Sequence, residues 1–354
     1  MNNKIYDLII IGGGQSALAC AYFLRRSNLD YLILDNQDQC GGAWLHAWES
    51  LTLFSPSQFS SLPGWMMPKS QGEYPSREEV ISYLCEYEKR YKIPVQRSTE
   101  VKQVTKEGDI FHLESSQGVY KSKSVIAATG TWMKPFIPEV PGKNIFEGQQ
   151  LHSAHFWSAD EYKGRKVLVV GEGNSGAQIL AEITKVTEAV WATKAEPEFL
   201  PDDVDGRVLF DMASAKYYAE QKGEPFDAAQ YNLGNIVMVP AVKDARTRGV
   251  LIAKGSFTEL SPTGVVWESG EEESFDVIIW CTGFNYATDY LEGLLEINHR
   301  GKIATDETKA KEVEGLWLVG FGGWTGFASA TLIGVGRSAR ATVKEVEEFL
   351  EKVE

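Results

Sequence analysis

Two glycine-rich segments of the 354-residue chain have the residue types and spacing that bind the diphosphate of a dinucleotide. In each, the first glycine permits a tight turn, the second lets the backbone approach the diphosphate, and a small last residue lets the next helix pack closely. The start of that helix directs N–H groups and a positive dipole end at the phosphates. The two turns are Gly12-Gly13-Gly14-Gln15-Ser16-Ala17 and Gly171-Glu172-Gly173-Asn174-Ser175-Gly176.

A charged residue follows each turn at the same distance, and the two charges are opposite. Asp35 stands 21 residues after Gly14. Lys194, which follows Thr193, stands 21 residues after Gly173. A carboxylate here accepts hydrogen bonds from ribose hydroxyls, whereas an ammonium attracts a 2′-phosphate. The first turn is therefore predicted to bind FAD, and the second to bind NADPH in preference to NADH. Use of both nicotinamide cofactors stays open, and the alternative for Lys194 is a solvated lysine without a role in binding.

The elements around both turns have the pattern of a βαβ unit. Residues 5–11 and 166–170 are apolar runs typical of parallel strands covered on both faces. A helical pattern follows each turn, and the next apolar runs, 31–35 and 189–193, end at or beside the two charged positions. The sequence predicts an α/β fold with two Rossmann-like dinucleotide-binding domains.

Three more apolar strands end in glycine-containing segments that could reach the cofactors. Residues 124–130 and 276–283 end in Thr-Gly, and each could carry the chain from one domain to the other. Residues 315–320 precede a helical pattern over 331–353 whose N-terminus could face a flavin ring. The alternative for each is an ordinary glycine between strand and loop. The expected cofactor contacts here are Thr129, Gly130, Cys281, Thr282, Gly283 and Gly320.

These landmarks predict that the nicotinamide domain is inserted in a discontinuous FAD domain. The FAD-binding domain is expected at residues 1–160 and 281–354, and the NAD(P)-binding domain at residues 161–280. Residues 197–249 lack the pattern of a compact βαβ unit. We expect a helix-containing excursion there that could cover the cleft.

Composition and charge exclude several other classes of protein. No run reaches the roughly 18 apolar residues of a membrane-spanning helix, and a net charge of −14 disfavours nucleic acid and anionic membranes as partners. Without a recognisable export signal the chain is expected to be soluble and cytoplasmic. Its scattered cysteines form no C-x-x-C, are expected to be reduced thiols, and exclude disulfide-reductase chemistry. They are Cys20, Cys40, Cys85 and Cys281.

A more specific signature precedes the second turn. Residues 146–156, FEGQQLHSAHF, match F-x-G-x-x-x-H-x-x-x-[FY], so the chain resembles the flavin-containing monooxygenases, particularly their short bacterial sulfoxidising members. Baeyer–Villiger enzymes have Trp at the last position, where this chain has Phe156, with Trp157 one residue out of register. Residues 74–80 and the segment Gly41-Gly42-Ala43-Trp44 also agree with the family, which adds Gly42 and Trp44 to the expected cofactor contacts.

The resemblance implies an NAD(P)H- and FAD-dependent monooxygenase. Such enzymes reduce FAD with a nicotinamide cofactor, form a C4a-(hydro)peroxyflavin with O2, and transfer one oxygen atom to a soft nucleophile such as a sulfide or an amine. The flavin does this chemistry, while the protein provides placement and shielding from water. The implied partners are a small-molecule substrate and O2, and a homodimer is left open.

Two residues are interpreted through the family pattern. Many members carry Asn two residues before a proline near the flavin, and this chain has Phe54 before Pro56. A phenyl ring makes no such hydrogen bonds, so Phe54 is expected either to shape an apolar pocket over the flavin, with more leakage to hydrogen peroxide, or to be core. His152 is expected to organise the link between domains rather than to act as an acid or base.

The sequence leaves two other functions open. One is an NAD(P)H dehydrogenase or oxidase of the same flavoprotein superfamily, which passes electrons to a quinone, a carrier or O2. The other is a nucleotide-binding sensor without turnover.

Overall fold

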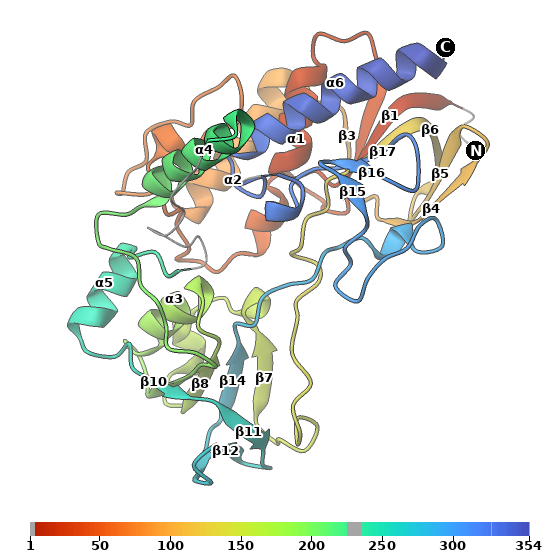
Figure 1. The fold of residues 1–354 in the computed structure, drawn as a ribbon. Coiled ribbons are helices and arrows are strands. Elements are labelled where there is room, and N and C mark those ends of the chain that lie inside the picture. Colours follow the sequence, from red (N-terminus) through yellow and green to blue (C-terminus); the bar gives the residue numbers. More distant parts are fainter. Residues whose placement is uncertain (1–3, 225–234, 327, 354) are drawn as a thin grey trace. The chain divides into compact units, whose positions relative to one another are not determined.

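The computed structural model describes residues 4–224, 235–326 and 328–353 (Figure 1). The chain forms two compact units, each assembled from segments that are far apart in the sequence. The first unit comprises Met1–Leu45, Pro56–Lys134 and Asn285–Glu354, and the second comprises His46–Ser55 and Pro135–Phe284.

The first unit is built on a sheet whose centre is parallel. Strand β1 lies between β2 and β6, and β3 and β17 extend the parallel set on either side. Consecutive residues Leu8, Ile9 and Ile10 of β1 are fully buried, so both faces of this strand are covered. The parallel strands are β1 (Ile5–Ile11), β2 (Tyr31–Leu34), β3 (Val95–Gln96), β6 (Gly118–Ala127) and β17 (Leu316–Leu318). Antiparallel strands β4 (Val101–Glu107), β5 (Ile110–Ser115), β15 (Thr305–Asp306) and β16 (Lys309–Ala310) complete the sheet.

Three helices belong to this unit: α1 (Gln15–Leu24), α2 (Arg77–Tyr91) and α6 (Val335–Val353). Helices α1 and α6 lie side by side, and α1 also contacts α2 (Figure 1). The start of α2 is encoded locally as a capping box. The Ser76 hydroxyl accepts a hydrogen bond from the Glu79 N–H, and the Glu79 carboxylate accepts one from the Ser76 N–H at 2.8 Å.

The second unit has a parallel sheet in the order β10-β9-β8-β14-β7 and a small antiparallel sheet in the order β11-β12-β13. The parallel strands are β7 (Gln149–His152), β8 (Val167–Val170), β9 (Ala189–Ala192), β10 (Ala253–Gly255) and β14 (Val277–Trp280). The antiparallel strands are β11 (Phe257–Leu260), β12 (Gly264–Trp267) and β13 (Glu272–Ser274). The helices are α3 (Asn174–Ile183), α4 (Gly206–Lys222) and α5 (Pro240–Thr247). The predicted α/β class with two Rossmann-like parallel sheets is thus confirmed.

Three local expectations differ from the structure. Strand β7 pairs with β14, so the segment from Pro135 to residue 160 belongs to the second unit rather than to the expected first domain. Segments His46–Ser55 and 281–284, both expected in the first domain, also belong to the second unit. The last helix begins at Val335, after turns at residues 331–334, and not at Thr331. Of the predicted excursion over 197–249, residues 225–234 lie outside the described part, and the remainder contains α4 and α5.

The expectation of four reduced thiols is wrong for two of them. Cys40, after β2, and Cys85, on α2, form a disulfide with their Cα atoms 5.2 Å apart. The fold brings them together across 45 positions of sequence, which spacing alone does not reveal. Cys20 and Cys281 are free and buried, and burial raises the pKa of each thiol to about 12.

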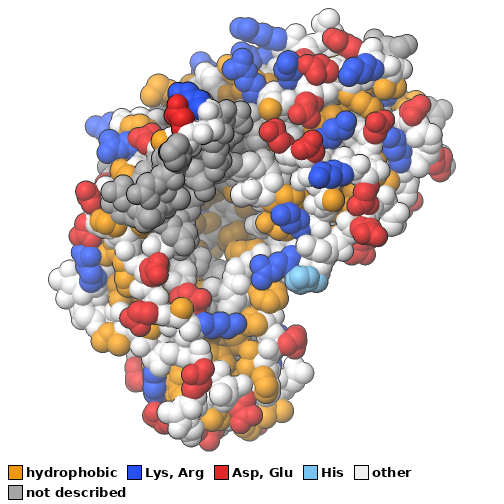
Figure 2. Space-filling model, viewed as in Figure 1, with side chains coloured by type: hydrophobic (Ala, Val, Ile, Leu, Met, Phe, Trp, Pro, Cys, Tyr) orange, Lys and Arg blue, Asp and Glu red, His pale blue; other side chains and the backbone are white. Residues whose placement is uncertain are grey.

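Acidic and basic side chains are interspersed on the face that Figure 2 shows. Among the described residues, no helix is both long and apolar enough to cross a membrane. Within the same ranges no cluster of His, Cys, Asp and Glu side chains has the arrangement of a metal site.

Candidate functional site

The first glycine turn joins β1 to α1 and leaves one position open. Gly12 has φ +98°, and a Cβ there would lie 2.8 Å from the carbonyl oxygen of Ala128. A Cβ on Gly14 would meet nothing closer than the Cα of Gly42, at 3.9 Å. Close packing inside the chain therefore requires glycine at position 12 but not at position 14. An open glycine at the N-cap of a helix is the arrangement in which a backbone receives a diphosphate.

The second turn likewise has a first glycine that close packing requires and a second glycine that faces open space. Gly171 has φ +126°, and a Cβ there would lie 2.4 Å from the carbonyl oxygen of Cys281. A Cβ on Gly176 would lie 2.1 Å from the oxygen of Gly171. A Cβ on Gly173, the N-cap of α3, would meet no atom within 4 Å. Both turns therefore pass the same test of fit to a dinucleotide.

Loop residues complete the first turn from other parts of the chain. A Cβ on Gly42 would lie 2.8 Å from the Cα of Gly14, so only glycine allows this close approach. A Cβ on Gly320 would lie 1.9 Å from the Ser16 hydroxyl oxygen, which places the end of β17 against the start of α1. The Gln15 amide donates to the carbonyl of Ala330 at 2.5 Å. The structure thus brings the predicted residues Gly42 and Gly320 to the first turn.

The predicted ribose carboxylate, Asp35, is buried and paired. Its side chain forms an ion pair with Arg97, which also pairs with Glu88 of α2, and it accepts a hydrogen bond from the Gly13 N–H. Burial raises the pKa of Asp35, although the Arg97 charge and the backbone hydrogen bonds oppose that shift. Sequence reasoning missed Arg97 and Glu88, because their pairing depends on tertiary packing.

The corresponding position in the second unit has a different environment. Thr193 is buried, and Lys194 is exposed. The Lys194 N–H donates to the Glu172 carboxylate at 3.3 Å, so a carboxylate lies beside the predicted cation. Asn174 uses its side chain inside the chain, since its oxygen accepts from the Val237 N–H at 2.9 Å and its amide donates to the Asn235 carbonyl at 3.2 Å. Sequence reasoning had assigned no role to the Glu172 side chain.

Each predicted Thr-Gly segment lies beside one of the turns, because β6 neighbours β1 and β14 neighbours β8. Thr129 donates to the Ala287 carbonyl at 2.6 Å, and Gly130 accepts from the Ala287 N–H at 2.9 Å. Thr282 donates to the Phe136 carbonyl at 2.5 Å, and Gly283 accepts from the Phe136 N–H at 2.9 Å. These segments hold the chain where it leaves one unit for the other.

The histidine of the signature holds a crossing segment within the second unit. His152 Nε2 donates to the Gly283 carbonyl at 2.9 Å, while Nδ1 accepts from the Ala154 N–H at 3.0 Å. Burial lowers the pKa of His152 to about 4, so the ring is neutral near neutral pH. Phe156 is buried and stacks on Tyr162, whereas 42% of Trp157 is exposed. Both imidazole nitrogens are used structurally.

Phe54 contacts the excursion that the sequence predicted. Its carbonyl accepts from the Gly206 N–H at 2.8 Å, and a Cβ on Gly206 would lie 2.6 Å from the phenyl ring. Phe54 is 37% exposed, so it is not a core residue. Gly206, the first residue of α4, therefore leaves the space that the Phe54 ring occupies.

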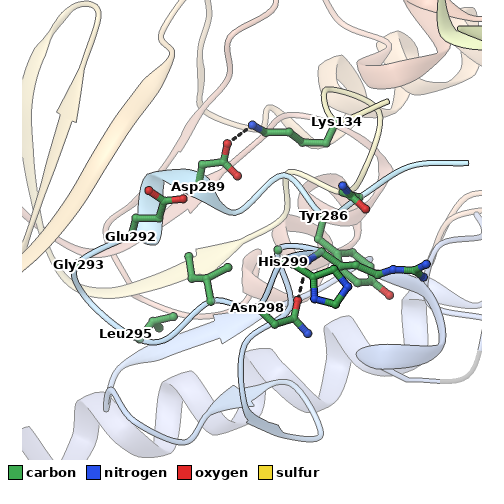
Figure 3. A pocket seen from close by; sticks show the side chains of 12 residues that line it. Lys134, Tyr286, Asp289, Glu292, Gly293, Leu295, Asn298 and His299 are labelled. Atoms are coloured by element: carbon green, nitrogen blue, oxygen red, sulfur yellow. Dashed lines mark hydrogen bonds and ion pairs between the residues drawn. The ribbon is translucent and has the colours of Figure 1, made fainter. Parts of the chain in front are cut away.

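A separate pocket of about 440 Å³ lies in the first unit (Figure 3). An ion pair between Lys134 and Asp289 crosses its lining. The lining contains neither glycine turn and none of the predicted cofactor contacts, so we do not assign it to a nucleotide. Its lining is Lys134, Asn285, Tyr286, Asp289, Glu292, Gly293, Leu295, Ile297, Asn298, His299, Arg300 and Gly301.

The chain is similar to known flavin monooxygenases and oxidoreductases over most of its length. Residues 9–209 match the family described as pyridine nucleotide-disulphide oxidoreductase. A flavin-containing monooxygenase from Stenotrophomonas maltophilia is 47% identical, with a TM-score of 0.89, over 98% of this chain and 99% of that chain. The uncharacterized oxidoreductase CzcO-like of Geobacillus kaustophilus is 28% identical over 97% of this chain and 98% of its own. A probable indole-3-pyruvate monooxygenase, YUCCA4 of Arabidopsis thaliana, is 27% identical over 88% of this chain and 84% of its own.

Proposed function

Because this chain belongs to the flavin-containing monooxygenases, within the pyridine nucleotide-disulphide oxidoreductase family, we propose that its first unit binds FAD and its second unit binds a nicotinamide cofactor. The chain is a flavin-dependent monooxygenase. The reaction we propose transfers one oxygen atom of O2 to a small soft nucleophile, such as a sulfide or an amine, while NAD(P)H supplies two electrons and the second oxygen atom leaves as water. The partners are then that small molecule and O2.

The observation that carries this proposal is the pair of open glycines. Gly14 and Gly173 are free of close packing at the N-caps of α1 and α3, while their neighbours Gly12 and Gly171 are tightly packed. A chain with a purely structural turn would have no need of glycine at the open positions. Both are where a diphosphate would approach the backbone.

The remaining predicted contacts are assigned to the two cofactors accordingly. For FAD we propose the Gln15 and Ser16 N–H groups and Asp35, with Gly42, Trp44, Thr129, Gly130 and Gly320 around them. For the nicotinamide cofactor we propose the Asn174 and Ser175 N–H groups, Gly176, Thr193 and Lys194, with Cys281, Thr282 and Gly283 around them. Ala17 sets the helix spacing in the first turn, where it is fully buried.

The side chains near the turns support a reaction in which bound FAD supplies the redox chemistry. The Cys281 thiol, with its pKa raised to about 12, is not a nucleophile near neutral pH, and both nitrogens of His152 are hydrogen-bonded. The work of the protein is then to hold the reactants and to exclude water. Phe54 would contribute an apolar surface to the substrate site, where it cannot donate or accept hydrogen bonds.

Isotope transfer tests the proposal directly. The purified, FAD-loaded protein is mixed with NADPH, 18O2 and a small aryl methyl sulfide, and the product is analysed by mass spectrometry. We expect one 18O atom in the sulfoxide and one sulfoxide formed per NADPH oxidised, less the fraction released as hydrogen peroxide. Catalase is included, because free peroxide also oxidises sulfides.

The same assay with a tertiary amine compares the two substrate classes. Oxidation of NADPH without 18O in either product, together with rapid reduction of an added quinone, would instead support a dehydrogenase. Failure of NADPH to bleach the flavin absorbance would contradict both enzymatic functions.

A further inference from the structure

The two turns place a carboxylate in the same position by opposite routes. In the first unit the carboxylate comes from the end of β2, because Asp35 accepts a hydrogen bond from the N–H of Gly13, the middle residue of the turn. In the second unit it comes from the turn, because Glu172 accepts a hydrogen bond from the N–H of Lys194, just beyond β9. Gly13 and Glu172 are equivalent in the two G-x-G segments.

The first turn explains why the carboxylate can come either from the residue after the strand or from the middle residue of the turn. A Cβ on Gly13 would lie 2.5 Å from the Asp35 carboxylate oxygen, so the carboxylate occupies the space that a side chain at position 13 would need. With Lys194 in place of an aspartate, that space is free in the second turn. The Glu172 side chain enters it from the turn and restores a negative charge there.

We infer that Glu172 is a specificity-determining residue, which accepts a hydrogen bond from the 2′-hydroxyl of the nicotinamide cofactor's adenosine ribose and repels a 2′-phosphate. The inference rests on the proposed function of the second turn. It extends that function to the cofactor class, since the chain then uses NADH as well as NADPH. Lys194 alone would favour NADPH, and Glu172 counteracts it.

The exposure of Glu172 and Lys194 decides which of the two charges has the larger effect on the choice between NADP+ and NAD+. Glu172 is half-buried against the turn, whereas Lys194 is exposed on a flexible side chain. Water and salt screen an exposed charge more strongly than a half-buried one. The Glu172 charge is also fixed in place by its hydrogen bond to the Lys194 N–H. Glu172 should therefore affect the choice between NADP+ and NAD+ at least as strongly as Lys194 does.

Equilibrium binding separates this role from catalysis. Dissociation constants of NAD+ and NADP+ are measured by calorimetry on the FAD-loaded wild type and on Glu172→Gln. The glutamine oxygen still accepts from the Lys194 N–H, so the turn keeps its geometry while its charge is removed. We expect NADP+ to bind about tenfold tighter and NAD+ to bind equally or more weakly, which shifts the difference between the two binding free energies by at least about 1.4 kcal/mol.

A matched control removes a nearby exposed carboxylate that is not part of the turn. Glu196→Gln, at an exposed position two residues after Lys194, should change the NADP+ to NAD+ ratio by less than about twofold. Lys194→Gln should shift the ratio in the opposite direction from Glu172→Gln. Circular dichroism melts of all variants verify that the fold is retained.

Three results would overturn the inference. An unchanged ratio in Glu172→Gln, or a shift no larger than in Glu196→Gln, removes Glu172 from recognition of the 2′ position but leaves the proposed function intact. A wild type that binds NADP+ at least a hundredfold tighter than NAD+ also contradicts it. Failure of the wild type to bind either nucleotide would overturn both the inference and the proposed role of the second turn.

Discussion

Cys40 and Cys85 join the loop after β2 to helix α2, with their Cα atoms 5.2 Å apart. Cys85 belongs to one stripe of α2 that is directed at this loop. Arg77 donates to the Leu45 carbonyl at 2.7 Å, and Ile81 lies against Gly41. Glu88, at the end of the stripe, holds Arg97 and through it Asp35. Helix α2 therefore supports both the predicted ribose carboxylate and the loop that brings Gly42 to Gly14.

Removing the disulfide should destabilise the first unit. The double variant Cys40→Ser/Cys85→Ser opens a loop of 45 positions and is expected to lose about 2–4 kcal/mol of unfolding free energy. It should also release FAD faster, because the loop that carries Gly42 is then held less firmly. Urea titration followed by circular dichroism measures the first effect, and flavin fluorescence after dilution measures the second.

A reducing agent supplies the control for this prediction. Wild type treated with a phosphine reductant should behave like the double variant, and the reductant should have no further effect on that variant. Equal stability of the oxidised and reduced wild type would show that the cross-link does not support the loop.

Alanine substitutions at the open glycines should separate the two cofactors. Gly14 and Gly173 both have extended backbone, and a Cβ on either meets no close neighbour, so neither change should lower the melting temperature of the cofactor-free protein. Gly173→Ala should retain FAD and bind the nicotinamide cofactor at least tenfold more weakly. Gly14→Ala should purify with less flavin.

Each variant controls for the other, since Gly14→Ala leaves the second turn intact and Gly173→Ala leaves the first turn intact. Gly12→Val should also purify without flavin, but its positive φ and its contact with Ala128 would disturb the fold as well. Loss of both cofactors in either alanine variant would contradict separate sites.

Reversing the charge of Lys194 should affect NADPH more than NADH. Lys194→Asp places a second carboxylate beside Glu172, and both would repel a 2′-phosphate. We expect the KM for NADPH to rise at least tenfold more than the KM for NADH in steady-state assays. Lys163→Asp makes the same charge change at another exposed position of the second unit and should alter both values equally. An unchanged preference would remove Lys194 from recognition of the 2′-phosphate.

Buried His152 should make the chain less stable in acid. Burial lowers its folded-state pKa to about 4, whereas the unfolded chain titrates near the ordinary value of 6.5. The unfolded state therefore takes up the proton first as pH falls. Stability from this group is complete above pH 6.5 and is lost between pH 6.5 and about 4, by at most about 3 kcal/mol.

Comparison with His152→Gln isolates this contribution from that of the carboxylates. Urea midpoints measured from pH 4 to pH 8 should fall more steeply in the wild type than in the variant. Parallel curves would show that His152 is protonated in the folded chain as readily as in the unfolded chain.

The glycine turns and their strands could be predicted because their signals are local. A positive φ at Gly12 and Gly171 selects glycine whatever the rest of the chain does, and a run of buried residues such as 8–10 reports a covered parallel strand. The pattern around His152 likewise identified the family, since it lies within one short segment. For these features the amino-acid sequence was sufficient to predict the fold class and the family.

Tertiary structure alone decided which distant residues meet. β7 pairs with β14 across more than a hundred residues of sequence. This pairing places the segment from Pro135 to residue 160 in the second unit, whereas the sequence predicted it in the first domain. The Cys40–Cys85 disulfide, the ion pairs of Arg97 and the contact of Glu172 with Lys194 depend in the same way on how helices and loops pack. Spacing fixes the conformation of a turn, but the charge that a ligand meets there is the sum of all side chains that folding brings to it.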